Sequence, residues 1–172
     1  KTLGIIGFGR IGQETAKIAL GIGMDVVYYD KYNESTELKL EFSKNKSLSF
    51  TINTSSLDEV LMKSDFITLH VPAQKEYIIG KNEFEKMKDG VGIINAARGG
   101  VIDETELINN LENKKVSFAG LDTFENEPTP SVKLLMHPKI SLSPHIGAAT
   151  SEAQNRIGTE LADQIINYFN ND

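Results

Sequence analysis

The sequence predicts an α/β fold, a doubly wound parallel sheet with helices on both faces. Three observations predict it. Short apolar runs alternate along the chain with segments whose apolar residues recur at helical spacing. The runs are apolar on both faces, as in parallel strands that lie between two helix layers. No repeat, linker or low-complexity tract breaks the alternation, so residues 1–172 are expected to form one domain.

Composition limits the classes of function. Hydrophobic residues make up 40% of the 172 and charged residues 24%, which is ordinary for a globular protein. The formal charge of −6 argues against a general binder of nucleic acid or of anionic membranes. No apolar run reaches the roughly 20 residues of a membrane span, and the start shows no signal-peptide pattern. The absence of cysteine excludes disulfides and thiolate metal sites and fits a cytoplasmic protein.

The first element is a strand over 2–6 that leads through three glycines into a helical pattern over 14–20. In a nucleotide-binding unit Gly7 makes the tight turn, Gly9 lets the backbone approach a pyrophosphate, and Gly12 lets the helix pack closely on the strand. The helix N-terminus, with its unpaired N–H groups, then faces the phosphates. A glycine turn alone is also common as a purely structural feature.

A second apolar run, over 24–29, ends at Asp30, which lies 18 residues beyond Gly12. A Rossmann unit places at about this distance the carboxylate that binds the hydroxyls of the adenosine ribose. The combination of strand, glycine turn, helix and acid favours dinucleotide binding over a merely structural turn.

The next elements follow from local signals. The polar segment 31–46 is compatible with a lid, a loop or a short helix, and 48–52 reads as a short strand. Ser56 and Glu59 have capping-box spacing, so a helix is predicted to start there and to bury Leu57, Val60 and Leu61.

The second half repeats the alternation. Further strands are predicted where apolar runs recur, over 65–71, 91–95, 116–121 and 139–143. Between them lie a short helix over 81–88 and a helix capped by Asp103. Ser151 and Gln154 have capping-box spacing and are predicted to open a last helix that runs to about Tyr168. Its apolar residues recur at i+4 spacing: Ala153, Ile157, Leu161, Ile165 and Phe169.

Polar side chains follow the strands at the carboxyl edge of the predicted sheet, where such folds bind ligands. An arginine, Arg98, suits a substrate carboxylate, and His145 suits proton transfer near neutral pH. Glu125 and Glu127 both qualify as the acid that orients the histidine. His70 ends a strand and is read as a packing or hydrogen-bonding residue. The scattered histidines give no metal-binding spacing. Loops are polar in any protein, so a chance grouping stays open.

Three motifs then carry a resemblance that spans nearly the whole chain. They are INAARGGVIDE at 94–104, AGLDTFENEP at 119–128 and SPHIGAAT at 143–150. Together they resemble the signatures of the D-isomer-specific 2-hydroxyacid dehydrogenases. The resemblance implies that Arg98 binds the substrate carboxylate and carbonyl, that His145 is the general acid/base, and that Glu127, immediately before proline, is its partner.

The same resemblance implies NAD as the cofactor. Arg10 and Ile11 would contact its pyrophosphate, Asp30 the adenosine ribose, and Asp122 the nicotinamide side. The full set expected to bind the cofactor is Gly7, Gly9, Arg10, Ile11, Gly12, Asp30, Val71, Pro72, Ala96, Ala97, Arg98, Asp122, His145, Gly147 and Ala148.

The function implied is hydride transfer between NAD and a D-2-hydroxy acid. Within the family the chain looks most like the phosphoglycerate dehydrogenases, which begin serine synthesis. Rival readings are a dehydrogenase of another small 2-hydroxy acid, a formate dehydrogenase, which has glutamine in place of Glu127, and an NAD sensor without turnover. The chain opens directly in its first strand, so the substrate-binding domain is expected to lie outside it. The expected partners are a small 2-hydroxy or 2-oxo acid and a second copy, as a homodimer through this domain, with no nucleic acid or membrane.

Overall fold

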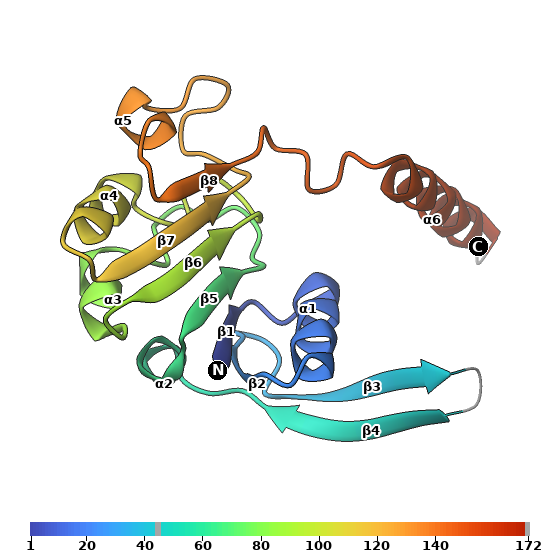
Figure 1. Cartoon of the computed structure of the whole chain (residues 1–172). Coiled ribbons are helices and arrows are strands. Elements are labelled where there is room, and N and C mark those ends of the chain that lie inside the picture. Colours follow the sequence, from blue (N-terminus) through green and yellow to red (C-terminus); the bar gives the residue numbers. More distant parts are fainter. Residues whose placement is uncertain (44–45, 171–172) are drawn as a thin grey trace.

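The computed structural model describes residues 1–43 and 46–170. Its main sheet is parallel and has the strand order β2-β1-β5-β6-β7-β8 (Figure 1). The strands are β1 (Thr2–Ile6), β2 (Asp25–Tyr29), β5 (Phe66–Leu69), β6 (Val91–Asn95), β7 (Val116–Leu121) and β8 (Ile140–Leu142). Strands are added in one direction from β1 to β2 and in the other from β5 onwards. The order therefore reverses beside β1, where doubly wound sheets bind ligands.

Helices cover both faces of this sheet, which confirms the predicted fold class. One face carries α1 (Arg10–Gly21), and the other carries α2 (Leu57–Lys63), α3 (Lys81–Lys86) and α4 (Glu104–Glu112) (Figure 1). Each face has its own apolar core. Ala16 and Ala19 of α1 pack with Leu3 and Ile5 in one cluster. The larger cluster joins α2, α3 and α4 to the strands through buried side chains such as Leu61, Phe84 and Leu107.

Two predicted helix starts are confirmed by their caps. The Ser56 hydroxyl accepts from the Glu59 N–H at 3.2 Å, and the Glu59 carboxylate accepts from the Ser56 N–H at 3.4 Å. Asp103 accepts from the Glu106 N–H at 3.0 Å and so caps α4. Because each cap satisfies a backbone N–H that has no partner inside the helix, it fixes where the helix begins.

The predicted capping box at Ser151 is wrong by one residue. Ser151 is already the first residue of the last helix, α6 (Ser151–Asn170). The cap is Thr150, whose hydroxyl accepts from the Ala153 N–H at 3.1 Å and whose carbonyl accepts from the Gln154 N–H at 3.0 Å. Thr150 and Ser151 are adjacent and both suit an N-cap, and Gln154 favoured the wrong one.

A β-hairpin occupies most of the segment that the sequence left open. Strand β3 (Ser35–Ser43) pairs antiparallel with β4 (Lys46–Asn53), and residues 44–45 lie outside the described residues. The predicted strand 48–52 therefore forms, but it pairs with β3 and not with the main sheet. Leu38 anchors the hairpin because it is fully buried beside Tyr28, whose ring stacks on Phe8 at 3.7 Å.

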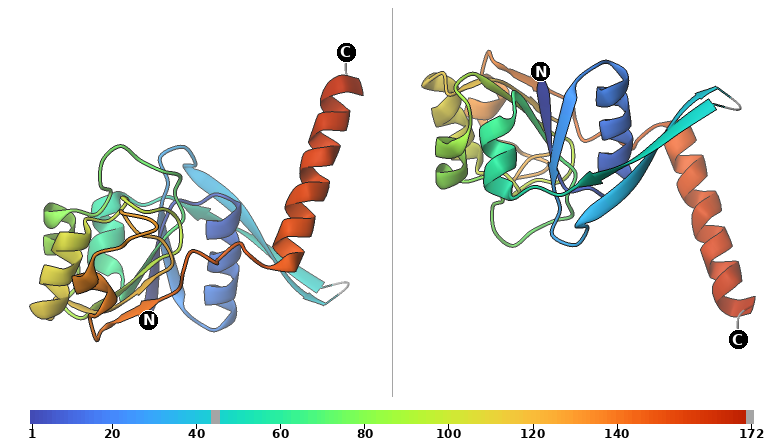
Figure 2. Two further views of the ribbon diagram at one scale, coloured as in Figure 1. Left: turned by 90° about the horizontal axis from the view of Figure 1, so that it is seen from above. Right: turned by 90° about the horizontal axis from the view of Figure 1, so that it is seen from below.

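Helix α6 stands away from the sheet and its other helices in the two views of Figure 2. Its apolar side chains Ile157, Leu161, Ile165 and Phe169 are 50 to 70% exposed, so its apolar face is not part of either core. The short helix α5 (Val132–Leu135), which the sequence did not predict, precedes β8. In residues 1–43 and 46–170, no helix is long and apolar enough to cross a bilayer.

Candidate active site

The glycine turn after β1 is tightly packed at two of its glycines and open at the third. Gly7 has a φ of 93°, and a Cβ there would overlap the carbonyl of His70. A Cβ on Gly12 would overlap the carbonyl of Gly7, so steric contact requires glycine at both positions. Gly9 differs, because no atom lies within 4 Å of a Cβ built there. The space over Gly9, at the open N-terminus of α1, is thus available to a phosphate group.

Asp30 is fixed at the end of β2 by backbone donors. Its Oδ2 accepts from the Phe8 N–H at 2.6 Å, and its Oδ1 accepts from the N–H groups of Tyr32 at 2.8 Å and Asn33 at 2.9 Å. Partial burial favours the neutral acid, but these bonds outweigh burial and hold the pKa of Asp30 below its ordinary value. The carboxylate is therefore charged at neutral pH and able to accept from ribose hydroxyls.

Two cavities run along the carboxyl edge of the sheet and share three lining residues, His70, Val71 and Pro72. The first, of about 440 Å³, is lined by Gly7 and Asp30 among others. The second, of about 630 Å³, is lined by ten predicted cofactor residues: Ile11, Val71, Pro72, Ala96, Ala97, Arg98, Asp122, His145, Gly147 and Ala148. The two cavities therefore adjoin along the carboxyl edge of the sheet, on either side of these shared residues. We call the two adjoining cavities the cleft.

Three predicted cofactor residues lie outside the linings of both cavities. They are Gly9, Arg10 and Gly12, all at the start of α1. Arg10 does not face the cleft but pairs with Glu160 of α6, its Nη1 lying 2.7 Å from Oε1. No local pattern indicates this pair, because the two residues lie 150 positions apart.

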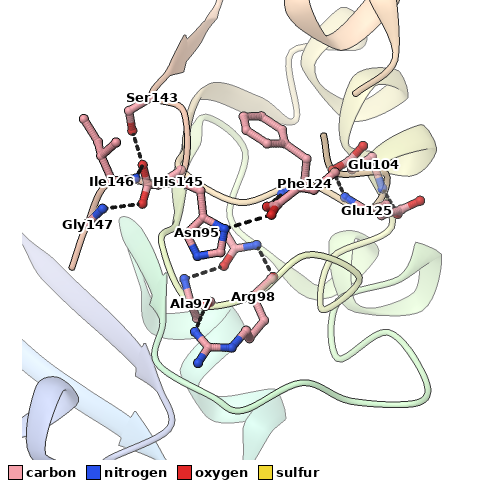
Figure 3. A network of polar contacts seen from close by, with 12 residues as sticks. Asn95, Ala97, Arg98, Glu104, Phe124, Glu125, Ser143, His145, Ile146 and Gly147 are labelled. Carbon is pink, nitrogen blue, oxygen red and sulfur yellow. Dashed lines mark hydrogen bonds and ion pairs between the residues drawn. The ribbon is translucent and has the colours of Figure 1, made fainter. Parts of the chain in front are cut away.

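The predicted acid and base are in contact (Figure 3). His145 Nδ1 lies 2.8 Å from Glu127 Oε2, and the other oxygen of Glu127 accepts from the Phe124 N–H at 2.9 Å. The bond to His145, followed by the bond from Phe124, holds the pKa of Glu127 below its ordinary value. Glu125 lies elsewhere and accepts from the Glu104 N–H. The geometry thus places Glu127, and not Glu125, beside the histidine.

Asp122, at the end of β7, holds the loop that carries His145. Its carboxylate accepts from the Ser143 hydroxyl at 2.6 Å and from the N–H groups of Ile146 at 2.9 Å and Gly147 at 2.8 Å (Figure 3). Burial opposes the charged form, yet these three bonds lower the pKa of Asp122. In addition to lining the second cavity, Asp122 therefore positions the histidine.

Arg98 reaches the same cavity from the loop after β6. Its Nη1 donates to the Ala97 carbonyl at 2.6 Å (Figure 3). Asn95 shapes this loop: its amide donates to the Arg98 carbonyl at 2.9 Å and accepts from the Ala97 N–H at 3.1 Å. Sequence reasoning gave Asn95 no role. A buried amide at the end of an apolar strand was the available signal, because such a group needs partners.

His70 has the structural role that was expected. Its Nε2 lies 3.2 Å from the Thr68 hydroxyl, and burial lowers the pKa of its ring. It also lines both cavities, so its position bears on the cleft as well as on packing.

Comparison with known proteins places this geometry in a family. Residues 1–147 match the model of the D-isomer specific 2-hydroxyacid dehydrogenase, NAD binding domain. The chain is 46% identical to a hydroxypyruvate reductase of Thermotoga maritima over 170 residues, which are 96% of the chain and 52% of that protein. It is 42% identical to a D-3-phosphoglycerate dehydrogenase of Archaeoglobus fulgidus over 170 residues, 97% of the chain and 31% of that protein.

Solved structures similar to this chain come from enzymes of related names. A glyoxylate reductase from Paecilomyes thermophila superposes with a TM-score of 0.78 at 37% identity, covering 92% of the chain and 46% of the reductase. A D-lactate dehydrogenase from Aquifex aeolicus, complexed with NAD and lactic acid, superposes with a TM-score of 0.75 at 31% identity, covering 99% of the chain and 54% of the dehydrogenase. The chain thus spans about half, or less, of these relatives. It belongs to the D-isomer specific 2-hydroxyacid dehydrogenase family, as an NAD-binding domain of that family.

Proposed function

We propose that this chain is the cofactor half of an enzyme that transfers a hydride between NAD and a D-2-hydroxy acid. The observation that carries the proposal is the 2.8 Å contact between His145 and Glu127 at a cavity that Arg98 also lines. An acid-paired histidine and a guanidinium at one cavity suit proton transfer on a substrate that carries a carboxylate.

His145, Glu127 and Arg98 have different roles in the proposed reaction. With neutral His145, the N–H on Nδ1 donates to Glu127, which leaves Nε2 free to accept the proton of the C2 hydroxyl. Glu127 keeps the ring in this tautomer and stabilises its charged form. Arg98 binds the carboxylate and orients C2. NAD, when bound, supplies the site that accepts the hydride. In reduction, protonated His145 returns its proton to the oxygen at C2.

Among 2-hydroxy acids we propose 3-phosphoglycerate, the first substrate of serine synthesis. The likeness to D-3-phosphoglycerate dehydrogenases of Archaeoglobus fulgidus and Bacillus subtilis supports it. The alternative is the 2-hydroxy acid that forms when the 2-oxo acid hydroxypyruvate is reduced, because a hydroxypyruvate reductase is among the most similar relatives. Assays with both substrates separate the two.

We further propose that a second domain outside this chain binds the substrate and closes over the cleft. The share of each relative that the chain spans supports this proposal. A homodimer through this domain is supported by two apolar side chains at the C-terminal end of α1, since Ile18 is 68% exposed and Ile22, which caps the helix, is 74% exposed. The absence of cysteine supports a cytoplasmic location, and the net charge of −6 supports the absence of a nucleic-acid partner.

The test has two parts. Titration of this chain with NADH, followed by fluorescence, should saturate, because the glycine turn, Asp30 and the cleft all lie within it. The full-length protein should then oxidise NADH with one of a panel of 2-oxo acids that includes phosphohydroxypyruvate and hydroxypyruvate. Binding without turnover on any member of the panel would favour an NAD sensor, and no binding would refute both.

A further inference from the structure

Two carboxylates beside the catalytic pair bind each other's backbone. Glu104, the first residue of α4, donates its N–H to Glu125 Oε1 at 2.9 Å. Glu125 in turn donates its N–H to Glu104 Oε1 at 2.8 Å. Figure 3 shows the two side chains crossing between the start of α4 and the loop after β7. We call this reciprocal pair the Glu104–Glu125 clasp.

The clasp is one of several contacts between the loop that carries Arg98 and the loop that carries Glu127. Glu125 lies two positions before Glu127 in the chain. Phe124, the residue before Glu125, donates its N–H to the Glu127 carboxylate. On the other side, Gly99 follows Arg98 and presses against the same loop, since a Cβ on Gly99 would overlap the carbonyl of Phe124. The loop that carries Arg98 is thus held against Phe124 and Glu125, shortly before Glu127, through Gly99 at one point and Glu104 at another.

Electrostatics gives no reason for two carboxylates to lie here. Burial raises the pKa of Glu104, and the charges of Glu125 and Glu127 raise it further. Glu125 also faces the phenol of Tyr77. The negative charge of Glu125 is the largest cause of the raised pKa of Tyr77, followed by burial, and the charges of Asp103 and Glu104 raise this pKa further. The surroundings of Glu104 therefore oppose its ionisation on balance, although the N–H of Glu125 favours the charged form, while the two hydrogen bonds fix the separation of two loops.

We propose that Glu104 and Glu125 are positioning residues, which act on the reaction by holding Glu127 against His145 and at a fixed distance from Arg98. Neither touches the reacting atoms. This proposal rests on the proposed function for its effect on turnover, but its effect on Glu127 is independent of any activity. A misplacement of about 1 Å in such a site can lower the rate by about a hundredfold.

Two substitutions of Glu104 distinguish the effect of its side-chain length from the effect of its charge. Glu104→Asp keeps the charge, and aspartate is favourable in the first turn of a helix, but its carboxylate is withdrawn by about 1.5 Å, one C–C bond. Glu104→Gln keeps the reach and an oxygen that can accept from the Glu125 N–H, but removes the charge. Glu106→Asp is the matched control, since Glu106 lies in the same turn and its carboxylate accepts from the Asn109 amide at 3.5 Å, away from the clasp.

The first measurement is the titration of the Glu127 carboxyl by NMR in this chain, without cofactor or substrate. Because its bonds to His145 and Phe124 keep the pKa of Glu127 low, Glu104→Asp should raise that pKa towards its ordinary value. Glu104→Gln should not raise the midpoint, because the loss of a neighbouring negative charge favours the ionised form of Glu127, and Glu106→Asp should leave the midpoint where it is. An unchanged midpoint in folded Glu104→Asp overturns the proposal, and so does a rise in Glu104→Gln as large as in Glu104→Asp.

The second measurement is steady-state turnover of the full-length protein. Glu104→Asp should lower kcat by about tenfold or more with little change in the KM for NADH, whereas Glu104→Gln should stay within about threefold of the wild type. If the wild type turns over no 2-oxo acid, the proposed function fails while the Glu127 titration still tests the clasp. Equal kcat in wild type and Glu104→Asp overturns the positioning role.

Discussion

Arg10 and Glu160 form a two-pronged ion pair between the first residue of α1 and the middle of α6. Nη1 lies 2.7 Å from Oε1 and Nη2 3.4 Å from Oε2. Family resemblance assigns Arg10 to the cofactor pyrophosphate, yet here its guanidinium faces a carboxylate, which lowers the pKa of Glu160. With Arg10 assigned to the pyrophosphate, we predict that a phosphate and Glu160 compete for the same guanidinium.

Glu160→Gln should tighten NADH binding, because it removes the competing charge. The pair is exposed, so the gain should be about two- to fivefold in dissociation constant and should shrink as salt is added. Fluorescence titration measures it. Asp163→Asn, which removes the same charge elsewhere on α6, is the control. Weaker binding by Glu160→Gln would contradict a competition.

The glycines of the turn should respond differently to alanine. Gly12→Ala places a Cβ on the Gly7 carbonyl and should lower the free energy of unfolding by about 1–3 kcal/mol. Gly9→Ala meets no atom within 4 Å, so the unfolding transition should stay within about 0.5 kcal/mol of the wild type. NADH affinity should nevertheless fall by about tenfold or more, since the methyl group occupies the space of a phosphate. Urea unfolding and NADH titration of both variants test the contrast; a stable Gly9→Ala that binds normally would remove Gly9 from the site.

Asp30 should select NAD over NADP. The carboxylate is ionised at neutral pH and would face the additional phosphate of NADP as a like charge, which Lys31 offsets only in part. NADPH should therefore bind on the order of a hundredfold more weakly than NADH. Asp30→Asn, which retains an oxygen acceptor for the Phe8 N–H, should narrow the gap. Equal dissociation constants for the two cofactors in the wild type would refute the selection.

Asp122 should make stability depend on pH. Its folded-state pKa lies below the unfolded value of about 4, so its contribution is complete above that value and is lost as the pH falls through the folded pKa. Asp122→Asn should cost about 1–3 kcal/mol at neutral pH and much less in strong acid. Urea unfolding at both pH values measures this, with exposed Asp25→Asn as the control. A cost that does not change with pH would contradict the assignment.

Much of the fold follows from local sequence. The glycine turn, the apolar strands and the caps at Ser56 and Asp103 are determined by neighbouring residues, and all are found in the structure. The hairpin was missed because its pairing depends on Leu38 reaching a core formed by Tyr28 and Phe8, which no local pattern reveals.

The site was predictable where motifs are contiguous and unpredictable where contacts are distant. Proline after Glu127 indicated which glutamate faces His145, and the 2.8 Å contact agrees with it. The Arg10–Glu160 pair joins residues 150 positions apart, and the Glu104–Glu125 clasp joins residues 21 positions apart. No local sequence pattern predicts contacts between residues so distant in the chain. The amphipathic pattern of α6 correctly indicated a helix, but an apolar stripe cannot say what covers it.

The most direct test of the account is the rate of NADH oxidation by full-length His145→Ala with its best 2-oxo acid. Loss of a general acid/base should lower turnover by about 10²- to 10⁴-fold, while NADH affinity stays near that of the wild type. His137→Ala is the matched control, because the His137 ring accepts from the nearby Lys139 N–H, at 3.2 Å, away from the cleft, and its loss should leave turnover unchanged. Turnover by His145→Ala equal to that of the wild type would contradict the central role given to the His145–Glu127 pair.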